Sequence, residues 1–236
     1  MIVLGIDTST ADAAVAVTRE GDLVAEGAAG PDEGGRPRHS ALLLAEVEGC
    51  VEAAGGWRRI ERIGVGVGPG SYTGLRIGIA TAQALAQARS LPLCGVVSLA
   101  ALALGMAGHP LADARPLLPV IDARRRQVFA SLHDPDGTER WPPLVATPAE
   151  LGERLAELET APLAAGDGAL RFPSELEAAG AVVAPDGDAA HRVAARHVCA
   201  LAEAMKPSPS GRVEPLYLRA PDAEIWLERD RGKPSW

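Results

Sequence analysis

The feature that most constrains the fold is an internal repeat in the order of the expected elements. An apolar stretch at residues 2–6 ends in Asp7, and a second one at 117–121 ends in Asp122. Each aspartate is followed by the same expected order, which is turn, strand, turn, strand, helix and strand. Such a repeat predicts an α/β protein built from two halves, each with its own mixed sheet.

The residue pattern also predicts the bounds of the elements. Apolar runs between Gly, Pro and Asp turn signals predict strands at 2–6, 13–18, 23–28, 63–67, 93–97, 117–121, 127–132, 141–146, 163–165 and 182–184. Helical spacing with start and stop signals predicts helices at 39–54, 75–89, 99–107, 148–158, 173–180 and 189–205. Ser98 is expected to cap the helix that starts at Leu99. The expected units are 1–108, 109–219 and a C-terminal extension, 220–236.

Composition excludes several classes of protein. With 23 basic and 31 acidic residues the chain has a formal charge of −8, whereas a free-standing nucleic-acid binder needs a basic surface. The three cysteines, Cys50, Cys94 and Cys199, form no CxxC pair, so we expect reduced, buried thiols and a cytoplasmic location. The first residues lack the basic segment of a signal peptide. The uncharged stretch 90–112 is broken by Gly and Pro, so we expect no membrane span.

The glycine-rich stretch at 64–78, GVGVGPGSYTGLRIG, raises the question of a phosphate site. It fits neither the Walker pattern nor the dinucleotide-binding pattern, because the glycine spacings differ and no lysine follows. What remains is a glycine-rich turn before a helix. Such a turn can bind an anion through its free amides, or it can let two backbones approach closely. Both interpretations stay open from the sequence alone.

Small residues recur every four positions on two faces of the helix expected at 75–89: Gly78, Ala82 and Ala86 on one, Ala80, Ala84 and Ala88 on the other. One face must pack on the protein's own sheet or on a neighbouring helix. The second face is either available to a partner or reflects only the abundance of alanine in this chain. In the helix expected at 39–54, Leu42 lies off the apolar arc beside Glu46. Leu42 is either an ordinary exposed leucine or part of a helical interface.

Five stretches together carry a family resemblance: LGIDTSTADAAVAV, RHSALLL, GPGSYTGLRIG, IDARRRQVFA and VEPLYLR. Through them the chain resembles the TsaB (YeaZ) family over nearly its whole length, to about Arg219. The resemblance implies the duplicated actin/hexokinase/Hsp70-like fold (the ASKHA fold, which is ribonuclease H-like), in agreement with the internal repeat. The segment after Arg219 lies outside it.

The resemblance also implies a function. Members of this family are the non-catalytic partners of TsaD, which forms N6-threonylcarbamoyladenosine (t6A) at position 37 of tRNAs that read ANN codons. It implies a TsaE-like ATPase as a further partner, with ATP and metal on the partner subunits. Because the chain is acidic, we expect tRNA to be bound only through the complex. A homodimer through the same helices when no partner is present is a further expectation, since a patch that accepts a homologue can accept a second copy of itself. The residues expected at the interface with TsaD are His39, Leu42, Leu43, Glu46, Thr73, Arg76, Ile77, Ala80 and Ala84.

Relatives with the duplicated fold bind ATP between their halves, which makes a vestigial nucleotide site a second expectation. Its candidate residues are Asp7, Thr8, Ser9, Gly70, Ser71 and Asp122. The hairpins after the two aspartates read Asp-Thr-Ser-Thr and Asp-Ala-Arg-Arg, without the glycines that let phosphates approach the backbone. The aspartates themselves leave weak nucleotide binding open, and with it an alternative function as an ATP-dependent phosphotransferase or hydrolase.

The sequence offers no set of residues for other chemistry. None of the five histidines has a second one four positions away, so the helical pair that binds a metal in the catalytic relative is missing. His39 is therefore expected at the start of a helix or at an interface. We expect no resident metal, no cofactor of the chain's own and no catalytic residue.

Overall fold

The computed structural model describes residues 1–209 and 211–219, and it contains two five-stranded mixed sheets. The first has the order β3-β2-β1-β4-β5, with bounds Asp22–Ala29, Ala13–Arg19, Ile2–Asp7, Arg62–Gly68 and Leu93–Val97. The second has the order β8-β7-β6-β9-β10, with bounds Glu139–Ala146, Gln127–His133, Leu117–Arg124, Leu163–Ala165 and Val182–Val183. All ten expected strands are present.

The two sheets have the same topology. In each, the first three strands form antiparallel pairs, and the fourth and fifth strands run parallel to the first. The expected duplication is therefore confirmed, and so is the ASKHA-like fold class.

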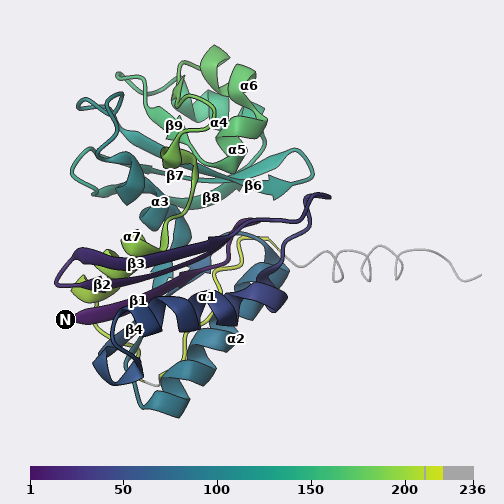
Figure 1. Cartoon of the computed structure of the whole chain (residues 1–236). Helices are drawn as coiled ribbons and strands as arrows, with labels where there is room; N and C mark the ends of the chain where they lie inside the picture. The colour runs from purple at the N-terminus through teal and green to yellow at the C-terminus, as the bar shows by residue number, and fades with distance from the viewer. Residues whose placement is uncertain (210, 220–236) are drawn as a thin grey trace, which may run out of the picture.

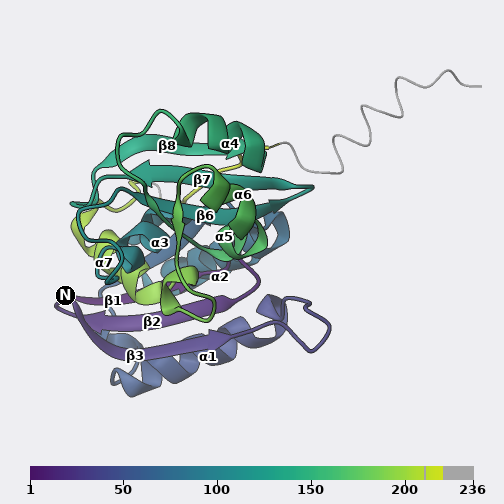
Figure 2. The same cartoon turned by 90° about the horizontal axis from the view of Figure 1, so that it is seen from above.

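The helices form three layers around the two sheets (Figure 1). Helices α1 (His39–Ala53) and α2 (Tyr72–Arg89) cover the outer face of the first sheet. Helices α4 (Pro148–Leu155), α5 (Asp167–Arg171) and α6 (Pro173–Ala178) cover the outer face of the second. Between the sheets lie α3 (Ser98–Met106) and α7 (Ala195–Ala204), which share one apolar core with both sheets. Figure 2 shows the same layers from above.

The C-terminal helix α7 is fastened to the first sheet, although it follows the strands of the second. It packs against β1, β2 and β4, and a β-carbon on Gly64 would lie 2.6 Å from the β-carbon of Ala202. The guanidinium of Arg62 donates to the carbonyls of Ala202, Glu203 and Met205 at 2.7, 3.2 and 2.9 Å. These bonds supply partners for carbonyls that the end of a helix leaves free.

Two details of the expected elements are wrong. The helix expected at 189–205 is broken into a 3-10 turn, η2 (Ala189–His191), and α7, because the His191 ring bonds to Gly166, Ala184 and Pro185 and holds the chain there. Ser98 does not cap α3 but is its first residue, and its hydroxyl bonds to a carboxylate. The sequence reading also missed η1 (Trp57–Arg59) and α5.

The cysteines are as expected: Cys50, Cys94 and Cys199 are all buried free thiols. Burial raises the pKa of Cys199 to about 12, so this thiol is not reactive at neutral pH. Within the described residues, no helix combines the length and apolar character that a membrane crossing requires.

Candidate functional site

The glycine-rich loop joins β4 to α2 and packs on the first hairpin. The amide of Ser71 donates to the carbonyl of Ser9 at 2.7 Å. The Ser71 hydroxyl in turn accepts from the amide of Gly74 at 3.2 Å and caps α2, which begins at Tyr72. The loop therefore determines where α2 starts, three residues earlier than the sequence predicts.

The glycines of this stretch allow close approach of backbones. A β-carbon at Gly70 would collide with the Ser9 backbone, and one at Gly74 or Gly78 would collide with oxygen atoms of Thr8. The Thr8 hydroxyl also donates to the Gly74 carbonyl at 2.8 Å. Of the two interpretations left open by the sequence, the structure supports packing of α2 against the first hairpin.

Asp7, the first candidate carboxylate, points into the protein. Its Oδ1 accepts from the amide and hydroxyl of Ser9 at 2.8 and 2.6 Å, and its Oδ2 accepts from the Ser98 hydroxyl at 2.7 Å. A β-carbon at Gly66 would collide with Oδ2, so β4 lies directly against the carboxylate. Burial raises the pKa of Asp7, while the bonds from Ser9 and Ser98 and the nearby His39 lower it.

Asp122, the equivalent residue in the second half, is held by arginines. Its Oδ2 accepts from Arg171 at 2.6 Å and from Arg124 at 3.2 Å. Its backbone amide donates to Asp167 at 2.9 Å, and burial together with the Asp122 charge raises the pKa of Asp167. The positive charges that balance the Asp122 carboxylate are therefore Arg124 and Arg171 of the protein itself, in the place that a bound cation would take.

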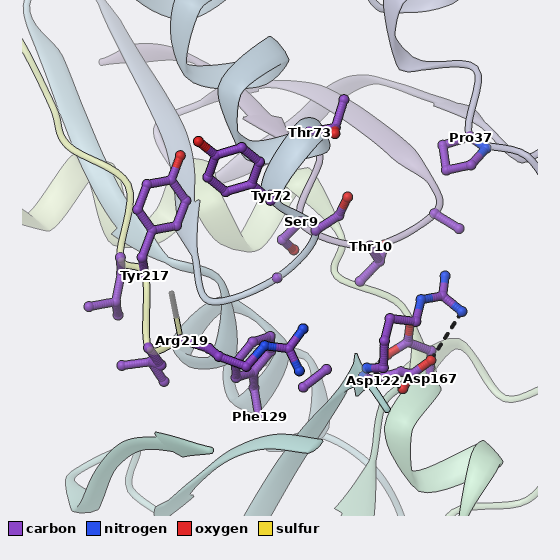
Figure 3. A pocket seen from close by; sticks show the side chains of 17 residues that line it. Ser9, Thr10, Pro37, Tyr72, Thr73, Asp122, Phe129, Asp167, Tyr217 and Arg219 are labelled. Atoms are coloured by element: carbon purple, nitrogen blue, oxygen red, sulfur yellow. Dashed lines mark hydrogen bonds and ion pairs between the residues drawn. The ribbon is translucent and has the colours of Figure 1, made fainter. Parts of the chain in front are cut away.

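A cleft of about 360 Å³ lies between the two halves at the ends of β1, β4 and β6. Figure 3 shows two different ends of it: Tyr72, Tyr217, Phe129 and Arg219 lie toward one, and Asp122 and Asp167 lie together at the other. Of the nucleotide-site candidates, Ser9, Gly70, Ser71 and Asp122 line the cleft. Asp7 and Thr8 are buried beneath it and are not part of its lining.

The outer face of α1 and α2 is the second candidate region. On α2, Gly78, Ala82 and Ala86 are buried against the sheet, whereas the second small-residue face is exposed over Ala80, Ala84 and Ala88. This division is the one expected from the spacing of small residues in the sequence. The helix carries only two charged side chains, Arg76 and Arg89, over its 18 residues.

The nine interface candidates differ in accessibility. Thr73, Arg76, Ala80 and Ala84 are exposed, and Leu42, Glu46 and Ile77 are half-buried. His39 and Leu43 are buried in the protein's own core, where the His39 ring lies 3.1 Å from the Ala11 carbonyl.

Comparison with known proteins gives concordant results. The family described as TsaD, tRNA N6-adenosine threonylcarbamoyltransferase, matches residues 31–177. The Escherichia coli protein named tRNA threonylcarbamoyladenosine biosynthesis protein TsaB is 30% identical over 227 residues, which cover 93% of this chain and 95% of that protein. The chain belongs to the TsaB family.

Further relatives of this TsaB-family chain agree. The Bacillus subtilis TsaB is 33% identical over 133 residues, covering 56% of this chain and 55% of that protein. A solved structure described as YeaZ from Pseudomonas aeruginosa has a TM-score of 0.74 at 26% identity, and it covers 92% of this chain and 99% of the other. Family membership places the chain in t6A biosynthesis on tRNA.

The magnesium nucleotide of ASKHA relatives does not fit the cleft of this TsaB-family chain. A bound magnesium ion needs carboxylate oxygens that face the ligand, yet Asp7 points inward and Asp122 is paired with Arg124 and Arg171. No cluster of three or more metal-ligating side chains occurs among residues 1–209 and 211–219.

Several residues of both regions were not expected from the sequence. On α1, Leu44 is the exposed leucine, at 58%, and not Leu42. Exposed small residues also recur on α1 every four positions, at Ala41, Ala45 and Gly49, a spacing that could have been read from the sequence. Phe129 and Tyr217 join the cleft only through the fold, because each comes from a different segment.

Proposed function

We propose that this TsaB-family chain is a non-catalytic scaffold that binds a TsaD-like subunit and supports t6A formation at position 37 of tRNAs reading ANN codons. The observation that carries the proposal is the outer face of α2. There Ala80 and Ala84 are exposed on an 18-residue helix with only two charged side chains. A helix face that remains in water is usually rich in charge, so this composition suits a face that another helix covers.

The neighbouring helix α1 supports the same proposal. Leu44 is 58% exposed, and a β-carbon on Gly49 would meet nothing within 4 Å. Glycine inside a helix costs about 1 kcal/mol relative to alanine, and no neighbour among residues 1–209 and 211–219 requires that cost at Gly49. Small exposed residues on both helices allow the helices of a partner to approach closely.

The absence of catalysis is inferred from the two aspartates. Asp7 is fully engaged with Ser9 and Ser98, and Asp122 is engaged with Arg124 and Arg171. Neither carboxylate is available as a magnesium ligand or a general base. ATP, metal and the transfer reaction are therefore assigned to the partner subunits, and the alternative of an ATP-dependent phosphotransferase or hydrolase is not favoured.

The remaining parts of the proposal come from family membership. We expect a TsaE-like ATPase as a further partner, a cytoplasmic location and binding of tRNA mainly through the complex, because the formal charge of the chain is −8. We also expect a homodimer through the same helices when the partner is missing, since a patch that accepts a homologue can accept a second copy of itself.

Co-purification with a TsaD-like subunit tests the proposal through Ala80→Glu and Ala84→Glu. Each substitution places an unpaired charge in the proposed interface, which typically costs 2–5 kcal/mol, or roughly 30- to 4000-fold in Kd. The matched control is Ala178→Glu, at an exposed alanine of α6 on the opposite outer layer.

The expected result is loss of the partner with both α2 variants and retention with Ala178→Glu, while circular dichroism shows that all three remain folded. The interface proposal fails if the folded Ala80→Glu and Ala84→Glu variants bind the partner as tightly as the wild type. Turnover of ATP by the isolated wild-type chain would contradict its non-catalytic part.

A further inference from the structure

Three of the four tyrosine and phenylalanine residues of this chain meet at the cleft. Aromatic residues make up only 3% of the sequence, with four tryptophans, two tyrosines and two phenylalanines. Both tyrosines and Phe129 line this one cleft, although they come from α2, β7 and the C-terminal segment. The rings of Tyr72 and Tyr217 pack at an interplanar angle of 31° with their centroids 4.9 Å apart, and Figure 3 shows them side by side.

The two tyrosines are accessible. Tyr72 is 37% exposed and Tyr217 is 39% exposed. The guanidinium of Arg76 lies 5.0 Å from the centre of the Tyr72 ring. Tyr72 therefore contacts both Arg76 and Tyr217, and each tyrosine ring keeps exposed surface on which a further planar group can stack.

Two arginines line the cleft. Arg219 comes from the same segment as Tyr217 and donates to Gln127 at 3.1 Å. Arg124 lies toward the other end, where it and Arg171 are paired with the carboxylate of Asp122. Asp167 is the other acid of the lining, so the three arginines exceed the two acids by one charge. The region therefore suits a group with a single negative charge, within a chain whose overall charge is −8.

We propose that the cleft binds an unpaired RNA nucleotide, with its base stacked on Tyr217 and its phosphate near Arg124 and Arg219. This inference rests on the proposed function, since it assigns to this chain a contact with the tRNA on which the complex acts. Stacked aromatic rings beside arginines are the usual means of holding unpaired bases.

The charge of the ligand favours RNA over a free nucleotide. A nucleoside triphosphate carries several negative charges and normally brings a magnesium ion, for which Asp7 and Asp122 offer no open oxygen. A phosphodiester carries one charge per nucleotide, which one or two arginines can balance. Because the formal charge of the chain is −8, we expect this contact to be weak in the isolated chain. Within the complex, the same contact adds to the affinity for RNA.

Fluorescence anisotropy tests the inference with a labelled anticodon stem-loop of an ANN-reading tRNA. The probe is titrated with the full chain alone and with its complex with the TsaD-like subunit. Tyr217→Ala is compared with Tyr217→Phe, which keeps the ring, and Arg124→Ala with Arg58→Ala. Arg58 lies in η1, just before the N-terminal end of β4, whereas the cleft lies at the C-terminal end of that strand.

Loss of one stacking ring is expected to weaken RNA binding by roughly 5- to 150-fold in Tyr217→Ala, while Tyr217→Phe stays within about twofold of the wild type. Arg124→Ala is expected to lower the slope of log affinity against log salt by about 0.7, and Arg58→Ala is not. A blunt RNA duplex of equal length is expected to bind more weakly than the stem-loop.

Wild-type affinity in the Tyr217→Ala variant overturns the inference, and so does equal binding of the blunt duplex. Displacement of the stem-loop by micromolar AMP also overturns it, in favour of a small nucleotide. Partner binding is measured on the same samples. If the wild type does not bind the TsaD-like subunit, the proposed function fails while the RNA titration of the chain alone still gives its own answer.

Discussion

The hydroxyl of Ser98 donates a 2.7 Å hydrogen bond to Oδ2 of Asp7, and so joins the first residue of α3 to the last residue of β1. The same hydroxyl accepts from the amide of Gly68 at 3.2 Å, where β4 ends. One serine side chain therefore connects three elements beneath the cleft, and it gives the buried Asp7 carboxylate one of its three donors.

We predict that Ser98→Ala destabilises the protein. The substitution leaves Oδ2 of Asp7 and the amide of Gly68 buried without this partner, which costs about 1–3 kcal/mol. Urea unfolding at neutral pH measures the difference. Ser174→Ala, at an exposed position of α6, is the control and should stay within about 0.5 kcal/mol of the wild type. Equal stability of both variants would show that the Ser98 bond contributes nothing.

We predict opposite effects for two helical glycines. Gly78→Ala places a β-carbon against the Thr8 hydroxyl and should destabilise the chain by roughly 1–3 kcal/mol, because α2 must move away from the first hairpin. Gly49→Ala meets open space and should stabilise the isolated chain by up to about 1 kcal/mol, through its higher helix propensity.

Thermal unfolding of the two glycine variants checks the signs. If Gly49 serves close approach of a partner helix, Gly49→Ala should also weaken binding of the TsaD-like subunit while it raises the Tm of the chain alone. A Gly78→Ala protein as stable as the wild type would contradict the packing role of that glycine.

Much of the fold could be predicted from the sequence because its signals are local. Apolar runs with turn residues indicated all ten strands, and the repeat of Asp7 by Asp122 indicated the duplication. The small-residue spacing on α2 separated the packed face from the exposed one. These patterns depend on periods of two and 3.6 residues, which reflect burial directly.

The site was less predictable, because its geometry depends on contacts between distant segments. Ser98 looked like a helix cap, but a buried carboxylate 91 positions away in the sequence needed its hydroxyl. Leu43 and His39 looked available for a partner, yet the first sheet and the first hairpin cover them. The meeting of Tyr72 with Tyr217 depends on the path of the C-terminal segment, which has no periodic signal.

The stability of the protein should fall as the pH falls from 6.5 towards 4, and His197 should account for a large part of the loss. Burial, with a smaller effect from Arg196, lowers the pKa of His197 from 6.5 to about 4, and its ring packs against Gly105 of α3. Because the folded pKa is the lower one, the unfolded chain binds more protons throughout this interval, so stability rises with pH there.

The His197→Gln variant provides the test of this pH dependence. It removes the titrating group and should flatten the profile by about 2 kcal/mol between pH 6.5 and 4, an amount reduced from the full pKa difference because the side chain keeps some contact with water. Free energies of unfolding from urea titrations at half-unit intervals of pH measure this difference. His133, whose pKa burial also lowers, remains in both proteins and provides the common background. Parallel profiles for the wild type and His197→Gln would exclude His197 as the source of the acid sensitivity.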